Sequence, residues 1–337
     1  MTSEENKNSD PKSAWMQNRS EPFLTRFVHV PAVVFTLKFR PENLRTVQAV
    51  RAETVPSIAM RFDLISIFPI FFTSVFDYGI LKRARTVGLV DITTHDLRAF
   101  THDRHRTVDD RPFGGGEGMV LKLEPIYDAI SSLNITHKQE RDPKKETVIL
   151  LSAQGQPFTQ KIAQELATVE RVVLICGRYE GVDERVSEML CDRELSIGDY
   201  VLSGGELGAA VIVDAVVRLL PGALGHPDSS RFESFGAEDA VEENDPSDGP
   251  PRTTHGAGGI LDYPHYTRPA EFGDAAVPDV LQGGNHDAIR LWRRKMALRK
   301  TLRNRPDLLE KVSLSPQDRR LLREIETELS GEDGFPA

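Results

Sequence analysis

Two short apolar runs separated by one helical pattern most strongly limit the fold of this chain. Residues 147–152 (TVILLS) and 171–176 (RVVLIC) each have the length and apolar character of a buried strand. Residues 157–168 between them place Ile162 and Leu166 on one face of a helix. A strand, a helix and a second strand at this spacing predict an α/β fold with a parallel sheet.

The strand pattern begins at Met60. Residues 61–68 (RFDLISIF) alternate in character and are rich in β-forming residues, so they predict a strand. Residues 1–59 differ from the rest: they open on a polar, disorder-prone segment, and the mildly apolar stretch over 27–39 lacks the cleavage pattern of a secretory signal. We therefore predict an N-terminal extension that is largely disordered or irregular, with Met60 as an alternative natural start.

The second half of the chain reads as helices joined by one long irregular stretch. Residues 207–220 predict a mostly apolar helix, whereas 236–259 hold Pro, Gly, Asp and Glu without periodicity and predict a loop or disorder. Apolar residues at helical spacing over 289–302 predict a further helix, and Ser315-Pro316 opens another.

Charge is unevenly distributed along the chain. The net charge of −9 at first argues against a nucleic-acid partner, but residues 228–258 hold eight acidic and two basic residues and account for −6 of it. Basic residues gather over 82–111 and again over 290–305. Each basic group fits either a phosphate-binding surface or a solvated helix face, so charge alone leaves both readings open.

Cysteine content and hydropathy exclude several classes of protein. Cys176 and Cys191 are the two cysteines, which excludes a disulfide scaffold and a CxxC-type zinc site and fits a reducing, cytoplasmic compartment. No run approaches the roughly 18 uncharged apolar residues of a membrane helix, so we predict no membrane association.

Four segments are too rich in glycine, charge and histidine for ordinary linkers: 100–119, 151–155, 176–185 and 196–206. The last three follow or interrupt predicted strands, and loops at the carboxyl ends of parallel strands gather at one edge of a sheet, where ligands bind. Glycines there let the backbone approach a ligand closely, so we predict a backbone-lined pocket.

Familiar nucleotide and metal motifs are missing. The sequence has no GxxxxGK[ST] and no GxGxxG after a strand, and GGGEG (114–118) suits a flexible loop or lid. His95, His102 and His105 are spaced too irregularly for a convincing zinc site.

At its glycine-rich loops the sequence resembles the bacterial tRNA (guanine-N1)-methyltransferase family, a member of the knotted SPOUT methyltransferases. The resemblance covers nearly all of residues 60–330 and rests on FTHDRHRTVDDRPFGGGEGM, CGRYEGVDER, SIGDYVLSGGE, LDYPHYTRP and GNHDAIRLWR. It implies a parallel α/β sheet with a deep trefoil knot and a small all-helical C-terminal domain. It also implies methyl transfer from S-adenosylmethionine to N1 of the guanine just 3′ of the anticodon, position 37 of the tRNA, by a homodimer whose sites combine both subunits.

The resemblance also divides the chain and places the methyl donor. It implies a knotted domain over 60–225, an interdomain linker with an acidic insert over 226–262, and a helical tRNA-binding domain over 263–337. The donor pocket it implies is made mostly of backbone and consists of Leu151, Ser152, Gln154, Gly155, Gly177, Tyr179, Glu180, Gly181, Ser196, Ile197, Gly198, Asp199, Tyr200, Val201, Leu202, Gly204 and Gly205.

The acceptor chemistry requires a base and a cation. Guanine N1 carries a proton at neutral pH, so a carboxylate that removes it and a cation that stabilises charge on O6 would both lower the barrier. The resemblance places the base at Asp262 and the O6-binding cation at Arg218. The structural alternatives are a turn-capping role for Asp262 and a surface charge for Arg218.

The resemblance further implies a tRNA surface. His105, Arg106, Asp109 and Asp110 would hold the target guanine and its neighbour, which the family requires to be guanine at position 36. Phosphates of the anticodon stem would be bound by the helix over 290–305, through Arg290, Arg293 and Arg294. Magnesium assists the family's activity, and we expect any such ion near Glu180.

This sequence departs from the family pattern in three places. Residues 1–59 have no counterpart, Ala153 replaces the usual proline of the LSPQG loop, and the acidic stretch after Gly225 is roughly thirty residues longer than usual. Our hypothesis is that the insert bulges into solvent and leaves Asp262 free to act, so that deleting 236–256 leaves the methylation rate nearly intact.

Two alternatives to this enzyme remain. A tRNA-binding protein with an inactive donor site would need a broken 196–206 loop or a missing base, and the sequence has neither. A SPOUT enzyme acting on another RNA site or on a ribose 2′-hydroxyl would leave FTHDRHRTVDD unexplained.

Overall fold

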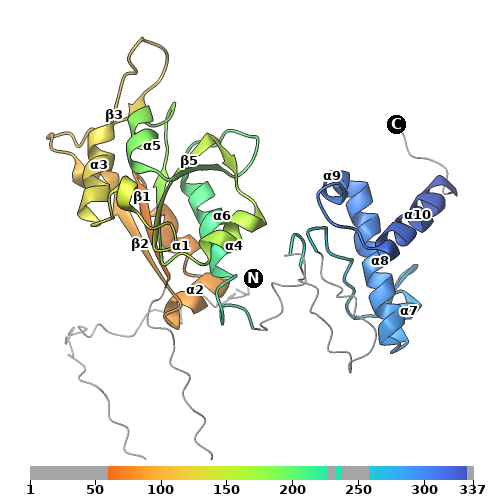
Figure 1. Cartoon of the computed structure of the whole chain (residues 1–337). Helices are drawn as coiled ribbons and strands as arrows, with labels where there is room; N and C mark the ends of the chain where they lie inside the picture. The colour runs from red at the N-terminus through yellow and green to blue at the C-terminus, as the bar shows by residue number, and fades with distance from the viewer. Residues whose placement is uncertain (1–59, 226–232, 237–257, 332–337) are drawn as a thin grey trace, which may run out of the picture. The chain divides into compact units, whose positions relative to one another are not determined.

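A five-stranded parallel sheet forms the centre of residues 60–225 (Figure 1). The computed structural model of the chain describes residues 60–225, 233–236 and 258–331. The strands are β1 (Met60–Ser66), β2 (Val90–Asp96), β5 (Glu146–Pro157), β6 (Arg171–Cys176) and β7 (Arg193–Ser196), in the order β2-β1-β6-β5-β7. Every neighbouring pair is parallel, as the alternation of strands and helices predicts.

Helices cover both faces of the sheet, because its strands are apolar on both sides. One face packs against α1 (Phe71–Val75), α2 (Gly79–Thr86), α4 (Gln160–Leu166) and α6 (Glu206–Val217). The other face packs against α3 (Leu123–Ser132) and α5 (Glu184–Leu190). Alternate residues of one strand serve the two layers: Val172 and Leu174 of β6 lie in the first core, and Val173 and Ile175 lie in the second.

The predicted elements are found with shifted ends. The strand at residue 60 and the strand over 171–176 are present as expected. The helix expected from Pro157 begins instead at Gln160, because the Thr159 hydroxyl caps it by accepting from the Ile162 N–H. The strand over 147–152 is longer than expected and continues to Pro157 as β5.

Short elements connect the layers. Two 3-10 helices span Leu97–Phe100 and Lys138–Glu140. The antiparallel pair β3 (Asp109–Asp110) and β4 (Val120–Leu121) closes the segment rich in glycine and charge that we singled out over 100–119.

The C-terminal residues form helices with a hydrophobic core of their own. After the small antiparallel pair β8 (Glu271–Phe272) and β9 (Ala275–Ala276) come α7 (Asp279–Gln282), α8 (His286–Asn304), α9 (Pro306–Leu309) and α10 (Pro316–Gly331). Their core contains Leu298, Leu321 and Ile325, together with Ile260 from the preceding segment. The expected disorder of residues 1–59 and the expected outward bulge of the acidic insert lie outside the described residues. None of the helices in the described ranges has both the length and the apolar character needed to cross a lipid bilayer.

Candidate active site at the carboxyl edge of the sheet

A cleft of about 230 Å³ lies at a bulge within β5 and at the ends of β6 and β7. Three of the four segments singled out from the sequence meet there, as the carboxyl-edge argument predicts. Fifteen of the residues assigned to the donor pocket line this cleft: Leu151, Ser152, Gln154, Gly177, Tyr179, Glu180, Gly181, Ser196, Ile197, Gly198, Tyr200, Val201, Leu202, Gly204 and Gly205.

Two residues assigned to the pocket do not line the cleft. Asp199 is exposed beside it. Gly155 lies in a bulge of β5, where Leu151 and Gln156 both align with Leu195 of β7 and the residues between them loop out. A Cβ on Gly155 would lie 2.5 Å from the Leu195 nitrogen. The glycine therefore allows β5 to bulge against β7, and the bulge carries Ser152 and Gln154 to the cleft.

The loop after β6 is held in a constrained conformation. Tyr179 has φ +61°, a left-handed conformation that non-glycine residues rarely adopt, and its side chain is half exposed. The Glu180 N–H donates to the Met119 carbonyl at 3.0 Å, and the Leu121 N–H donates to the Gly181 carbonyl at 3.0 Å. Strained backbone of this kind concentrates at functional sites. The hydrogen bonds also bring the end of the 100–119 segment against the cleft, which the sequence alone did not predict.

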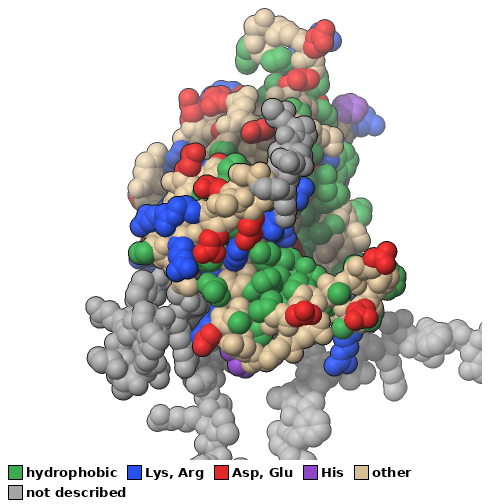
Figure 2. Space-filling model, turned by 90° about the vertical axis from the view of Figure 1, so that its right-hand side faces the viewer, with side chains coloured by type: hydrophobic (Ala, Val, Ile, Leu, Met, Phe, Trp, Pro, Cys, Tyr) green, Lys and Arg blue, Asp and Glu red, His purple; other side chains and the backbone are tan. Residues whose placement is uncertain are grey.

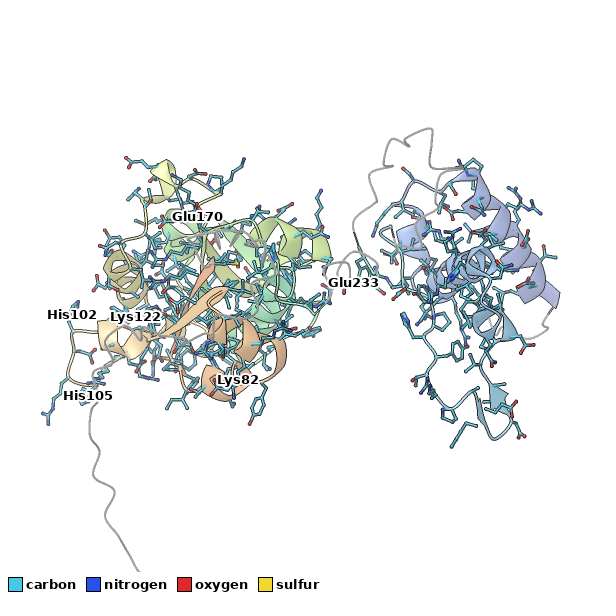
Figure 3. The ribbon with its side chains drawn as sticks, turned by 90° about the horizontal axis from the view of Figure 1, so that it is seen from below. Lys82, His102, His105, Lys122, Glu170 and Glu233 are labelled. Atoms are coloured by element: carbon cyan, nitrogen blue, oxygen red, sulfur yellow. The ribbon has the colours of Figure 1, made fainter. Side chains whose placement is uncertain are left out.

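Arg218, the cation assigned to O6, lies at the C-cap of α6 and pairs with a carboxylate. Its Nη1 and Nη2 each lie 2.5 Å from an oxygen of Glu233, in a two-pronged ion pair. The hydrogen bonds that Arg218 donates to the Glu233 carboxylate raise the pKa of the Arg218 guanidinium, so Arg218 remains a cation at any working pH. Glu233, which Figure 3 labels, was absent from our sequence prediction because it lies within the long linker without a motif around it.

Asp262 has its own set of partners. Its backbone N–H donates to the Ser234 hydroxyl at 2.9 Å, and its carboxylate accepts the Tyr263 N–H at 2.8 Å and lies 2.9 Å from His265 Nε2. The side chain is about one fifth exposed. The turn-capping role named as an alternative is thus present in this structure, through the contact to the Tyr263 N–H. Ser234 and Asp262 also bring the segment carrying Glu233 close to the segment carrying Asp262.

The histidines and acids of the 100–119 segment lie near the surface. Figure 3 shows His102 and His105 projecting from the edge of the ribbon, and His102 Nε2 lies 2.8 Å from Asp128 Oδ2. Arg106 has a left-handed backbone, and Asp109 and Asp110 form β3. None of these contacts forms a metal cluster: no group of three or more His, Cys, Asp or Glu residues within the described ranges is arranged to hold a metal ion.

Several basic side chains of helix α8 are paired with carboxylates of the protein itself. Arg294, which we assigned to tRNA phosphates, makes a two-pronged ion pair with Asp318 at 2.7 and 3.0 Å and is mostly buried. Asp318 in turn accepts the Ser315 N–H at 3.0 Å near the start of α10. Arg294 therefore joins α8 to α10. Arg293 stacks over the Tyr263 ring at 4.9 Å, and Arg290 pairs with Asp287 on the same helix.

Comparison with known proteins identifies the family of the chain. The family profile described as "tRNA (Guanine-1)-methyltransferase TrmD" matches residues 60–311. The chain belongs to this family. Its relatives include the tRNA (guanine-N(1)-)-methyltransferase of Koribacter versatilis, 59% identical over 79% of this chain and 98% of the relative. Those of Dictyoglomus turgidum and Moorella thermoacetica are 53% and 50% identical, over 81% and 79% of this chain and 99% and 96% of the relatives.

The match confirms the resemblance and the enzyme class predicted from the sequence. The chain is a tRNA (guanine-N1)-methyltransferase of the TrmD family. Its matched region starts at residue 60, where β1 begins, so residues 1–59 lie outside it. Membership in a methyltransferase family implies S-adenosylmethionine as the methyl donor.

The residues of the cleft fit such a donor. Gly177 and Gly205 lie so close to neighbouring backbone that a Cβ would come within 3.0 Å of the Leu151 carbonyl oxygen or 2.8 Å of the Cys176 Cα. The loops therefore meet backbone to backbone at these two glycines, where no side chain could fit between them. The carboxylates of Glu180 and Glu194 also line the cleft and can face a cationic sulfur.

Proposed function

We propose that this enzyme methylates N1 of the guanine at position 37 of tRNA and holds S-adenosylmethionine in the cleft between the bulge of β5 and the loops after β6 and β7. The observation that carries the proposal is the meeting of three glycine-rich loops around one cavity of about 230 Å³. The seventeen residues assigned above to the donor pocket remain the proposed pocket. Within them, Gly155 and Asp199 act through the shape of the loops.

The reaction requires a base, a cation and correct positioning of the two substrates from the chain. S-adenosylmethionine supplies an electrophilic methyl group on a cationic sulfur, which becomes a neutral thioether. A carboxylate takes the proton from guanine N1 as the N–CH₃ bond forms. A cation stabilises the negative charge that grows on O6. Positioning of the two substrates supplies much of the remaining acceleration.

Asp262 is our proposed base and Arg218 our proposed O6 partner. Glu233 is a second candidate base, because it pairs with Arg218 and lies next to Ser234, whose hydroxyl accepts the Asp262 N–H. In the Arg218–Glu233 pair, the guanidinium is held by a carboxylate rather than by solvent. An incoming guanine that takes up Arg218 would release Glu233, so the two carboxylates must be tested side by side.

The finer features of the fold and assembly are proposals too. After β7 the chain passes the end of β6, where Arg178 and Gly204 form an isolated bridge and the Gly205 N–H donates to the Gly177 carbonyl at 2.9 Å. This passage supports a deep trefoil knot. Ile70, Leu207 and Val211 are large apolar side chains left exposed at α1 and α6. They support a homodimer whose sites combine both subunits.

For tRNA we propose recognition of guanine at positions 36 and 37 by His105, Arg106, Asp109 and Asp110. Arg290 and Arg293 are the proposed phosphate contacts of α8, and the burial of Arg294 against Asp318 makes it the weakest member of that set. Figure 2 shows hydrophobic side chains gathered on one face of the molecule, with Lys and Arg side chains as well as Asp and Glu side chains around them.

Two further assignments complete the proposal. We place the enzyme in the cytoplasm, with its tRNA substrate. If magnesium takes part, we place it near Glu180. No three-residue metal cluster exists in the described ranges, so such an ion would need oxygens from the substrates or water.

The experiment is methylation of tRNA transcripts with guanine or adenine at position 37, by the wild type and by Asp262→Ala, Glu233→Ala and Arg218→Ala variants. We expect product only with guanine, and a loss of at least a hundredfold in the single-turnover rate for Asp262→Ala and Arg218→Ala. A hundredfold loss with Glu233→Ala and a near-normal rate with Asp262→Ala would transfer the role of base to Glu233. Methylation of the adenine transcript would overturn the proposed site.

The alternatives are an RNA-binding protein without transfer and a SPOUT enzyme acting at another RNA site. Calorimetric titration with S-adenosylmethionine identifies the first, because no heat at millimolar donor would mean that the cleft binds no donor. Mapping the methylated nucleotide identifies the second.

A further inference from the structure

Glu206 is a nearly fully buried carboxylate, 1% exposed, at the start of α6. Both of its oxygens are engaged. Oε1 accepts the Ser66 hydroxyl at 2.6 Å, and Oε2 lies 3.0 Å from Arg178 Nε and 2.9 Å from Arg178 Nη2. A buried carboxylate is tolerated only when it is paired in this way, and the pair must hold a fixed geometry.

Arg178 connects the two glycine-rich loops that form the cleft. It lies in the loop after β6, between Gly177 and Tyr179, and its Nη1 donates to the Ser203 carbonyl at 2.9 Å in the loop after β7. Its guanidinium also lies 4.7 Å from the centre of the Phe68 ring, and the backbone N–H of Phe68 donates to Ser66 Oγ at 2.8 Å.

The loops approach so closely at this point that side chains are excluded. A Cβ on Gly204 would lie 2.1 Å from Arg178 Nε. The backbone contact of Gly205 with Gly177, 2.9 Å from N to O, closes the junction on its other side. One arginine therefore fixes the distance between two walls of the cleft, and Glu206 fixes the arginine.

Charge explains why the partner is a carboxylate. An uncompensated guanidinium lining a site for a cationic sulfonium would repel it, and Glu206 neutralises that charge from the buried start of α6. The arginine then supplies several N–H donors to the loops without adding net positive charge.

We propose that Ser66, Arg178, Ser203 and Glu206, the Arg178–Glu206 clamp, order the donor loops and thereby set the affinity for S-adenosylmethionine. This inference rests on the proposed donor site, and it makes Glu206 and Arg178 positioning residues. Neither residue takes part in the chemical step.

The test uses two variants. Glu206→Gln keeps the size of the side chain and removes its charge. Arg178→Lys keeps the positive charge but cannot make the several N–H contacts of the guanidinium. We expect the calorimetric Kd for S-adenosylmethionine to rise at least tenfold in each, with the Kd for tRNA changed less than threefold. The double variant should be no worse than about threefold beyond either single, because the two residues act as one unit.

Asp63→Asn is the matched control, since Asp63 is an equally buried carboxylate, 0% exposed, that contacts Arg61, His95 and Arg171 away from the cleft. We expect it to lower stability and to leave the donor Kd within twofold. An unchanged donor Kd in Glu206→Gln, additive losses in the double variant, or an equal loss in Asp63→Asn would overturn the inference.

A second measurement does not depend on the donor. Amide hydrogen exchange at Gly205, whose N–H crosses between the loops, should be at least tenfold faster in Glu206→Gln and unchanged in Asp63→Asn. If the wild type binds no S-adenosylmethionine, the proposed function fails, and an unchanged exchange rate at Gly205 would overturn the clamp as well. Faster exchange there would support the ordering of the loops by the clamp and would overturn only its effect on donor affinity.

Discussion

Asp63 is a carboxylate buried in the middle of β1 and surrounded by three partners. Burial alone would raise its pKa, but hydrogen bonds from His95 Nε2, Arg61 and Arg171 at 2.7 to 2.9 Å outweigh that effect and lower the pKa from 3.8 to about 2. A carboxylate whose pKa is lower in the folded state stabilises the fold above its unfolded pKa and loses that contribution as the pH falls. For Asp63 the window runs from about pH 4 down to about pH 2.

We therefore expect Asp63→Asn to reduce the free energy of unfolding at pH 7 by about 2 to 4 kcal/mol, because it removes the carboxylate that pairs with the mostly buried Arg171 guanidinium and the half-exposed Arg61 guanidinium. Urea unfolding of both proteins, from pH 7 to the lowest pH at which the wild type stays folded, measures the difference and should show it shrinking below pH 4. A difference under about 0.5 kcal/mol at pH 7, or one that grows in acid, would contradict this account.

Long-range partners of single residues could not be predicted from the sequence. The alternation of β1 predicted a strand through Asp63, but its partner Arg171 lies 108 residues further along the chain, so no local pattern pointed to it. The roles of Glu233 and Glu206 were not predicted from the sequence for the same reason. Each acquires its role from a long-range arginine contact and not from its neighbours in the sequence.

At the level of elements, apolar runs were the reliable signal. Strands β1 and β6 lie where the sequence predicted them, because a short apolar run of β-forming residues is buried most readily as a strand inside a sheet. The exception is β5, which continues past the predicted loop at 151–155 to Pro157. Its second pairing with β7 depends on a neighbour more than 35 residues away, which periodicity within the strand does not reveal.

The bulge in β5 gives a prediction of its own. Gly155→Ala places a Cβ 2.5 Å from the Leu195 backbone nitrogen, which cannot move without displacing β7. We expect a loss of about 1 to 3 kcal/mol in unfolding free energy and a weaker Kd for S-adenosylmethionine, because Ser152 and Gln154 are carried by the same bulge. Urea unfolding and calorimetric titration measure the two effects.

Gly225→Ala is the control for this prediction. No atom of the residues that the structure describes lies within 4 Å of the Cβ it would add, and the substitution should change stability by less than about 0.5 kcal/mol. If Gly155→Ala behaved like this control, β5 and β7 would not be in contact at the bulge.

At the scale of the whole molecule, the acidic insert interrupts a segment whose two flanks are joined to each other. The Gly259 N–H donates to the Gly236 carbonyl at 2.9 Å, and the Phe235 N–H donates to the Ile260 carbonyl at 3.0 Å. The two described segments on either side of residues 237–257 therefore end close to each other. Joining Gly236 directly to Gly258 should require little rearrangement, and it would keep both Glu233 and Asp262 in place.

We expect the enzyme lacking 237–257 to methylate guanine-37 tRNA at a single-turnover rate within about threefold of the wild type. Removal of acidic charge should also tighten tRNA binding, most at low salt, because the phosphate backbone is repelled less. Single-turnover methylation and tRNA titrations at two salt concentrations measure both effects. A control that replaces 237–257 with an uncharged linker of equal length separates charge from length. A hundredfold slower reaction in the deletion, restored by the uncharged linker, would mean that the insert spaces the two carboxylates and does not simply extend away from them.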